Sequence, residues 1–189
     1  MRQRQYSRSG HGNHSSVLIV NDVPEQLELM YGLLRKAGYF VFMAGDGHEA
    51  LAIAKREQPD IVISDVAMPE LDGIEFCRLI RRDDELRSVP ILLVSALRKD
   101  TDSVIEGLEA GADDYLEMPF DSSRLVAKVS KLVERARLEG ALRDSEERYR
   151  LLFENTPQPI WVHDVETLDF LAVNESTIRT YGYSRQEFF

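Results

Sequence analysis

The chain has 189 residues, of which 43% are hydrophobic and 30% charged, and its formal net charge is −10. This length suits one full domain and part of another, and the composition is typical of a soluble globular protein. An acidic chain is poorly matched to nucleic acid, because neutralising phosphates requires clustered Lys and Arg, so we expect no nucleic-acid partner for it. No apolar run approaches the roughly 18 residues of a membrane span, so we also expect no membrane segment.

The first 16 residues, MRQRQYSRSGHGNHSS, carry Arg2, Arg4 and Arg8 and no acidic residue. Their Ser, Gly and Gln content favours a disordered basic leader over a segment that binds nucleic acid or membrane. The leader lacks the apolar core of a signal peptide. Cys77 is the single cysteine, which excludes an intrachain disulfide and fits a reducing compartment. These features predict a cytoplasmic protein.

From Val17 onward, short apolar runs alternate with segments of helical periodicity. Strands are predicted at 17–20, 40–44, 61–64, 91–96 and 115–117. Helices are predicted from Pro24 to Gly38, around 50–54, at 73–81, at 101–110 and from 122 onward. Five strands that alternate with five helices predict an α/β domain with a doubly wound parallel sheet, flavodoxin-like, in the order 2-1-3-4-5. Ligands bind such sheets beyond the carboxyl ends of the strands, where the strand order reverses.

Polar residues follow the apolar runs at this edge of the predicted sheet. Asn21 and Asp22 follow the first run, Asp65 follows the third, and Ser95 lies near the end of the fourth. Two facing carboxylates repel unless a cation lies between them, and oxygen ligands with few other donors favour Mg²⁺. We therefore predict Asp22 and Asp65 as Mg²⁺ ligands, with the backbone carbonyl of Ala67 as a third. Asn21 is expected to act as a neutral oxygen ligand or through a water.

Asp65 is also the better candidate for a nucleophile toward phosphorus, which would give an acyl phosphate. It ends the central run and precedes the turn-forming segment MPELDG. Ser95 is expected to donate a hydrogen bond to a phosphoryl oxygen. Asp22 alone or Ser95 alone is equally well explained as a local cap, but the joint placement of these polar residues at the ligand edge favours a functional site.

The region from Val17 to about Lys131 resembles a response-regulator receiver domain of two-component signalling. The resemblance is carried by VLIVND (17–22), ISDVAMPELDGIEF (63–76), ILLVSA (91–96) and GADDYLEMPF (111–120). It implies Mg²⁺ and the transfer of a phosphoryl group from a histidine kinase or phosphotransfer protein to Asp65. It also implies that Asp22 binds the metal, that Ser95 contacts the phosphoryl group and that Tyr115 changes rotamer between states.

Two positions depart from the pattern of this family. The family usually has a second acid where Asn21 stands and a lysine where Met118 stands. Asn21 weakens the attraction for a metal but keeps an oxygen ligand, whereas Met118 offers no charge and only a weak acceptor. The pocket keeps its net charge, because the missing carboxylate and the missing ammonium would be partners. The family turn also implies a cis peptide bond before Pro119.

Beyond Phe120 the helical pattern continues for about thirty residues. The positions of its repeat, apolar except for Ser145, are Leu125, Val129, Leu132 and Ala136, followed by Leu138, Leu142, Ser145, Tyr149 and Leu152. This 4-3-4 spacing favours a parallel coiled coil, and so a homodimer through the linker helix, over a single amphipathic helix that lies on its own domain. Gly140 and the shift between 136 and 138 interrupt the repeat.

The segment 147–189 resembles the start of a PAS sensory domain, through RYRLLFEN, PIWVHD and LAVNESTIRTYGYS. Strands are predicted at 160–162 and 170–173, followed by a short helix that opens at Asn174 and Glu175. Two strands and a few turns can hardly bury a core of their own, so we expect the chain to be a fragment of a longer protein. No PAS ligand is predicted.

The expected organisation is a disordered basic tail (1–16), a receiver domain (17–121), helix 5 with a coiled-coil linker (122–156) and an incomplete PAS segment (157–189). The favoured function is a phosphorelay switch at Asp65 that acts on a PAS-containing output region. The alternative is an atypical receiver that serves as a dimerisation or binding module without normal switching, which Met118 supports. A phosphatase is disfavoured, because such enzymes usually have a second acid where Ala67 stands, so we expect no enzyme beyond self-catalysed phosphotransfer.

Overall fold

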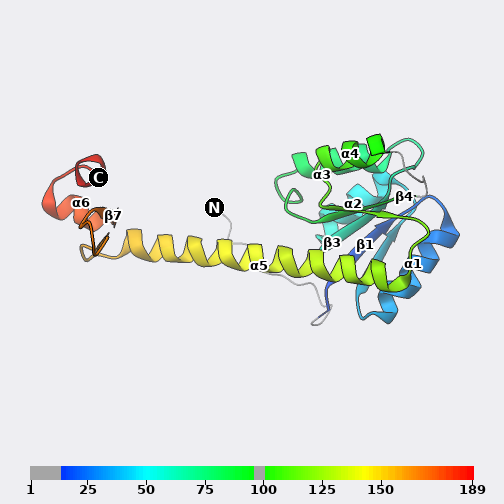
Figure 1. Ribbon diagram of the computed structural model, residues 1–189, viewed down its shortest axis with the longest axis horizontal. Helices are drawn as coiled ribbons and strands as arrows, with labels where there is room; N and C mark the ends of the chain where they lie inside the picture. The colour runs from blue at the N-terminus through cyan, green and yellow to red at the C-terminus, as the bar shows by residue number, and fades with distance from the viewer. Residues whose placement is uncertain (1–13, 96–100) are drawn as a thin grey trace. The chain divides into compact units, whose positions relative to one another are not determined.

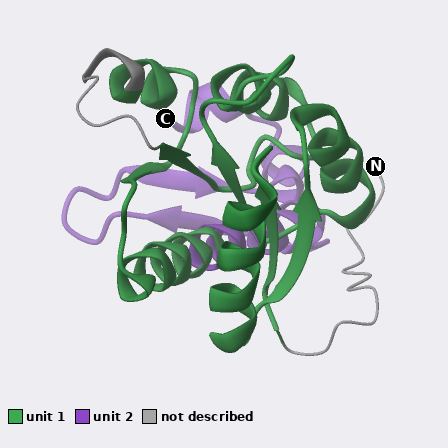
Figure 2. Cartoon of the chain, turned by 90° about the vertical axis from the view of Figure 1, so that its right-hand side faces the viewer, with its two compact units in different colours: residues 1–136 green, residues 137–189 purple. Residues whose placement is uncertain are grey.

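The computed structural model describes residues 14–95 and 101–189, with side chains in the second range from residue 104 onward. Residues 1–13 of the predicted leader and Ala96, the last residue of the fourth predicted strand, lie outside the described residues. The chain divides into two compact units, Met1–Ala136 and Arg137–Phe189 (Figure 2). The division falls inside one continuous helix, so it leaves the domain limits drawn from the sequence as predictions.

The first unit is built on a five-stranded sheet in the order β2-β1-β3-β4-β5, as predicted. Its strands are β1 (Ser16–Val20), β2 (Phe40–Ala44), β3 (Ile61–Asp65), β4 (Ile91–Ser95) and β5 (Asp114–Glu117). All neighbouring strands pair in parallel. Every residue of β3 and β4 is buried, because a parallel sheet is covered on both faces, and this is why their sequences are nearly continuous apolar runs.

Five helices accompany this sheet. They are α1 (Pro24–Lys36), α2 (Gly47–Glu57), α3 (Gly73–Arg82), α4 (Thr101–Glu109) and the first part of α5 (Ser122–Asn155). One apolar cluster joins α2 and α3 to one face of the sheet, and a second joins α1 and α5 to the other face (Figure 1). Asp46 and Asp72 cap α2 and α3, and Pro24 opens α1. Because helices cover both faces of the sheet, we look for a ligand site at the carboxyl ends of its strands.

Helix α5 is 34 residues long and continues without a break into the second unit. That unit also contains β6 (Trp161–His163), β7 (Phe170–Val173), α6 (Glu175–Tyr181) and α7 (Arg185–Phe188). The two strands form an antiparallel pair, and β6 begins one residue later than predicted. Helix α7 is not part of the sequence prediction, because four residues are too few to show a helical period. Among the described residues, no helix combines the length and apolar character that crossing a membrane requires.

Candidate phosphoacceptor and metal site

Asp65 is the last residue of β3, in the middle of the sheet. It pairs with Val94 of β4, while Ser64 pairs with Val20 of β1. The hydrogen bonding between β3 and β4 continues for one more residue, since the amide of Val66 donates to the carbonyl of Val94 across 2.9 Å. Asp65 is therefore held rigidly at the carboxyl edge, with only 6% of its surface exposed.

The carboxylate of Asp65 receives hydrogen bonds on both oxygens. Asn21 donates from Nδ2 to Oδ2 across 3.2 Å, and the backbone amide of Ala67 lies 3.4 Å from Oδ1. Burial nevertheless raises the pKa of Asp65, and the nearby charge of Asp22 adds to the rise, although the amides of Ala67 and Val66 and the Asn21 side chain oppose it. A cation beside these two carboxylates would offset both the desolvation and the repulsion.

Asn21 is buried and has a defined orientation. Its Oδ1 accepts a hydrogen bond of 2.8 Å from the amide of Val23, and its Nδ2 also lies 3.1 Å from Oε1 of Gln26. The nitrogen thus points toward Asp65 while the oxygen is engaged by the backbone that leads into α1. In this arrangement Asn21 acts as a donor to Asp65, and its role as an oxygen ligand or through a water stays a prediction.

The turn after β3 returns closely over the backbone of Asp65. The amide of Gly73 donates to the carbonyl of Val66 across 3.0 Å. A Cβ atom at Gly73 would lie 2.0 Å from the carbonyl oxygen of Asp65, so position 73 has no room for a side chain. The sequence suggested only a rigid turn at Asp72 and Gly73; the need for glycine comes from this close approach.

Ser95 and Met118 occupy the neighbouring strand ends. Ser95 ends β4, is 1% exposed, and accepts a backbone hydrogen bond of 2.8 Å from the amide of Met118. Met118 is half-buried and packs on the apolar cluster under α1 and α5, and its bond to Pro119 is cis, as predicted. Tyr115, on β5, is half-buried against the cluster on the opposite face. Met118 therefore adds apolar contact where the family pattern has a charge.

The oxygen donors at this edge fit a hard divalent cation such as Mg²⁺. Within the described ranges, no group of three or more His, Cys, Asp or Glu side chains is arranged to hold a metal ion. The candidates are the buried carboxylate of Asp65, the exposed carboxylate of Asp22 and the carbonyl of Ala67. Mg²⁺ binds hard oxygen ligands, uses one or two carboxylates and keeps several waters, which suits a set of this size.

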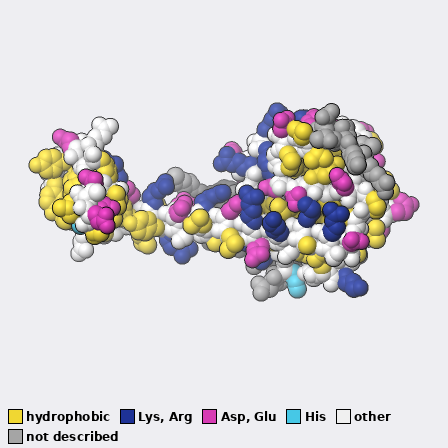
Figure 3. All heavy atoms as spheres, viewed as in Figure 1, with side chains coloured by type: hydrophobic (Ala, Val, Ile, Leu, Met, Phe, Trp, Pro, Cys, Tyr) yellow, Lys and Arg dark blue, Asp and Glu magenta, His cyan; other side chains and the backbone are white. Residues whose placement is uncertain are grey.

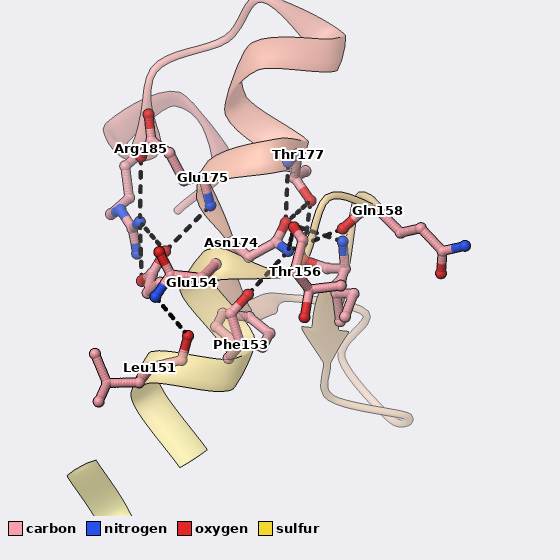
Figure 4. Close-up of polar contacts among 11 residues, drawn as sticks. Leu151, Phe153, Glu154, Thr156, Gln158, Asn174, Glu175, Thr177 and Arg185 are labelled. Atoms are coloured by element: carbon pink, nitrogen blue, oxygen red, sulfur yellow. Dashed lines mark hydrogen bonds and ion pairs between the residues drawn. The ribbon is translucent and has the colours of Figure 1, made fainter. Parts of the chain in front are cut away.

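A second polar cluster lies in the second unit, around Asn174 (Figure 4). Asn174 is fully buried; its Nδ2 donates to the carbonyls of Phe153 at 3.0 Å and Gln158 at 2.9 Å. Its Oδ1 accepts from the amides of Ile160 and Thr177, both at 3.0 Å. One side chain therefore ties the end of α5 to the segment before β6 and to the start of α6. The sequence predicted Asn174 only as the first residue of a helix.

Comparison with known proteins identifies the protein family to which this fold, with Asp65 at the carboxyl edge of its sheet, belongs. The response regulator receiver domain model matches residues 17–130, and the chain belongs to that family. A PAS domain model matches residues 147–188. Receiver domains are signalling modules of two-component phosphorelays, which agrees with the fold and with the placement of Asp65.

Individual relatives agree with this assignment. The DNA-binding dual master transcriptional regulator RpaA of Synechocystis sp. is 38% identical over 131 residues, which cover 69% of this chain and 54% of RpaA. The signal receiver domain of a histidine kinase from Syntrophus aciditrophicus is 36% identical with a TM-score of 0.60, covering 64% of this chain and 90% of that chain. The chain spans about half the length of the first curated relatives that it matches.

One similar solved structure contains a magnesium ion. The receiver domain of a sensor histidine kinase from Pseudomonas aeruginosa was solved with a magnesium ion coordinated in its active-site cleft. It is 31% identical to this chain with a TM-score of 0.60, covering 64% of this chain and 98% of that one.

Proposed function

We propose that the chain is a phosphorelay switch in which Asp65 accepts a phosphoryl group from a histidine kinase or a phosphotransfer protein. The observation that supports this most strongly is the setting of Asp65. Its carboxylate is buried at the end of the central strand, close enough to Asp22 for that charge to raise its pKa, with N–H donors on both oxygens. A buried carboxylate that is desolvated yet held in place by donors is suited to nucleophilic attack.

In the proposed transfer, an Asp65 oxygen attacks the phosphorus of a phosphohistidine. The new O–P bond forms as the N–P bond breaks, and the electron pair of that bond stays with the imidazole of the donor. Asp22, Asp65 and the Ala67 carbonyl would hold Mg²⁺, which would supply positive charge to offset the negative charge of the carboxylates and the phosphoryl group. The hydroxyl of Ser95 would donate to one phosphoryl oxygen.

The proposed output runs through α5 toward the PAS segment. Tyr115 lies on β5, and α5 follows β5 directly and packs on the sheet through Leu125 and Val129. Phosphorylation is a local change of charge that biases an element with two states. In this proposal the receiver spans 17–121 and the linker 122–156, the protein is cytoplasmic, and two copies associate through the linker helix.

A second candidate is a receiver-shaped binding module that does not switch. Met118 favours it, because a thioether packed on the apolar cluster cannot pair with a phosphoryl oxygen as an ammonium does. Dimerisation through α5 would then be the main task. The first candidate is preferred because Asp65, Asp22 and Ser95 all remain at the carboxyl edge.

Incubation with a small acyl-phosphate donor and Mg²⁺, followed by intact-mass measurement, tests the proposal. We expect a mass gain of one phosphoryl group that base removes and that Asp65→Ala abolishes. Cys77→Ser is the control for modification at another nucleophile and should leave the gain unchanged. Absence of an adduct in a protein that still binds Mg²⁺ would favour the binding module.

A further inference from the structure

Helix α5 carries two stripes of side chains that face different directions. The first consists of Leu125, Val129 and Leu132, which are buried in the apolar cluster under the sheet. The second lies one residue earlier at each turn, about 100° round the helix. Its members are Arg124, Lys128, Lys131 and Arg135, then Leu138, Leu142, Ser145, Tyr149 and Leu152. The two stripes explain the apparent shift of the repeat between 136 and 138.

The second stripe changes character at Leu138. Its four earlier members are cationic, and Figure 3 shows Lys and Arg side chains gathered over the part of α5 in the first unit. Lys128 pairs with Asp114 across 2.5 Å. From Leu138 onward the stripe is apolar except for Ser145, at an unbroken spacing of three and four residues.

The apolar part of this stripe is exposed. Leu138, Leu142, Tyr149 and Leu152 keep between 61% and 66% of their surface open. All residues from 141 to 152 are exposed, so this part of the helix buries no face within the described chain. A helix that buries no face is marginal in water, and most helical stability in proteins comes from packing an apolar stripe.

We infer that Leu138–Leu152 is the seam of a parallel, in-register coiled coil with a second copy of this chain, and that the seam ends at Leu138. This inference rests on the proposed association of two copies through the linker. A second copy fits because the stripe has the heptad spacing that packs against itself. In a parallel pair each of the five positions meets its own copy. In an antiparallel pair, each heptad position a would pack against position d of the partner. Either Leu138 or Leu152 would then have no partner within the seam.

The seam ends at Leu138 because its continuation is cationic. In a parallel pair, a seam that extended upstream would bring Lys131 and Arg124 against the same residues of the partner. Like charges at these inward positions oppose pairing, as a lysine in a coiled-coil core does at a cost in stability. The two helices are therefore expected to separate before they reach the receiver, which leaves each receiver free to respond on its own.

Disulfide trapping in the full chain tests the inference. Leu138→Cys and Leu152→Cys, each alone, are expected to give a covalent dimer under mild oxidation. Glu147→Cys, on the opposite side of the helix, is the matched control and should react at least tenfold more slowly. Lys131→Cys lies on the same stripe but beyond the proposed end, and should also be at least tenfold slower than Leu138→Cys.

The possible results separate the inference from the proposal on which it rests. Equal trapping at Lys131→Cys and Leu138→Cys would overturn the proposed end of the seam. Trapping only when Leu138→Cys is mixed with Tyr149→Cys would indicate an antiparallel pair and overturn the parallel seam, while the dimer would stand. A monomeric mass by light scattering in every variant would overturn both the seam and the linker dimer, without bearing on phosphorylation of Asp65.

Discussion

The Nδ2 atom of Asn21 lies 3.2 Å from Oδ2 of Asp65, and this hydrogen bond joins the end of β1 to the end of β3. The family pattern has an acid at position 21, which would repel Asp65 and attract a cation. Here an amide donor faces the carboxylate of Asp65 instead. At the end of β5, Met118 stands where the family has the ammonium of a lysine. We expect the two departures together to make the fold depend less on a bound cation.

Asn21→Asp should make the fold depend on Mg²⁺. The substitution removes a donor to a buried carboxylate and adds a like charge, so without metal the free energy of unfolding should fall by about 2 kcal/mol. Saturating Mg²⁺ should restore most of this loss, because a third carboxylate strengthens the donor set. Urea denaturation in EDTA and in Mg²⁺ measures both effects. Gln26→Ala, which removes a neutral partner of Asn21, is the control; an equal loss with and without Mg²⁺ in Asn21→Asp would contradict the assignment.

The charge of Asp65 should oppose folding in metal-free buffer. Burial raises the pKa of Asp65 above its ordinary value of 3.8, so the folded state holds the proton more tightly than the unfolded state. The stabilisation from the protonated carboxyl is then fully present below pH 3.8 and is lost as the pH rises from 3.8 through the raised pKa. Asp65→Asn should be more stable than the parent at neutral pH, with the difference shrinking toward acid. Thermal denaturation of both proteins in EDTA across this pH range measures the difference in stability. A difference that does not change with pH would contradict a buried Asp65 with a raised pKa.

Gly73→Ala should damage the site and the fold together. Its Cβ would meet the carbonyl oxygen of Asp65 at 2.0 Å, and backbone has to move to relieve the overlap. We expect a loss of about 3 kcal/mol in the free energy of unfolding by urea denaturation. Gly32→Ala is the matched control, since Gly32 lies within α1 with nothing within 4 Å of its Cβ position. It should gain up to about 1 kcal/mol; similar effects for the two variants would rule out the close approach.

Asn174→Ala should loosen the second unit without affecting the receiver. The substitution leaves the buried carbonyl of Phe153 and the amide of Ile160 without this partner, at a cost of about 3 kcal/mol for the set. Hydrogen exchange should quicken from 156 to 178 and stay unchanged in β1 to β5. Ser176→Ala is the milder control, because it removes only a hydrogen bond of 2.8 Å to the carbonyl of Thr156 and one of 3.0 Å from Arg179. Unchanged exchange in Asn174→Ala would show that the cluster does not hold this segment together.

The sheet and its strand order could be predicted because a buried parallel strand appears in the sequence as a continuous apolar run. The runs IVIS (61–64) and ILLVSA (91–96) are continuous because helices cover both faces, and the bounds of β2 were predicted without error. The placement of Asp65 at the ligand edge followed from the same logic, since residues that follow strands collect where the strand order reverses.

Contacts that depend on the exact path of the backbone could not be predicted in this way. The donation from Asn21 to Asp65 depends on how the amide of Val23 engages Oδ1, and residue type does not reveal this orientation. The requirement for glycine at 73 appears only when the turn is seen to return over Asp65. The role of Asn174 depends on three segments that meet in space. Sequence spacing alone carries none of this information.

Fluorine NMR of beryllofluoride, a mimic of the phosphoryl group, tests most directly whether Asp65 is a working phosphoacceptor. With Mg²⁺ present, the parent protein should show bound fluoride resonances that are absent in Asp65→Ala and absent without Mg²⁺. Met118→Lys should bind beryllofluoride more tightly, because an ammonium would then face the fluorides. Bound resonances that persist in Asp65→Ala, or their absence from a parent protein that still binds Mg²⁺, would contradict the assignment of Asp65.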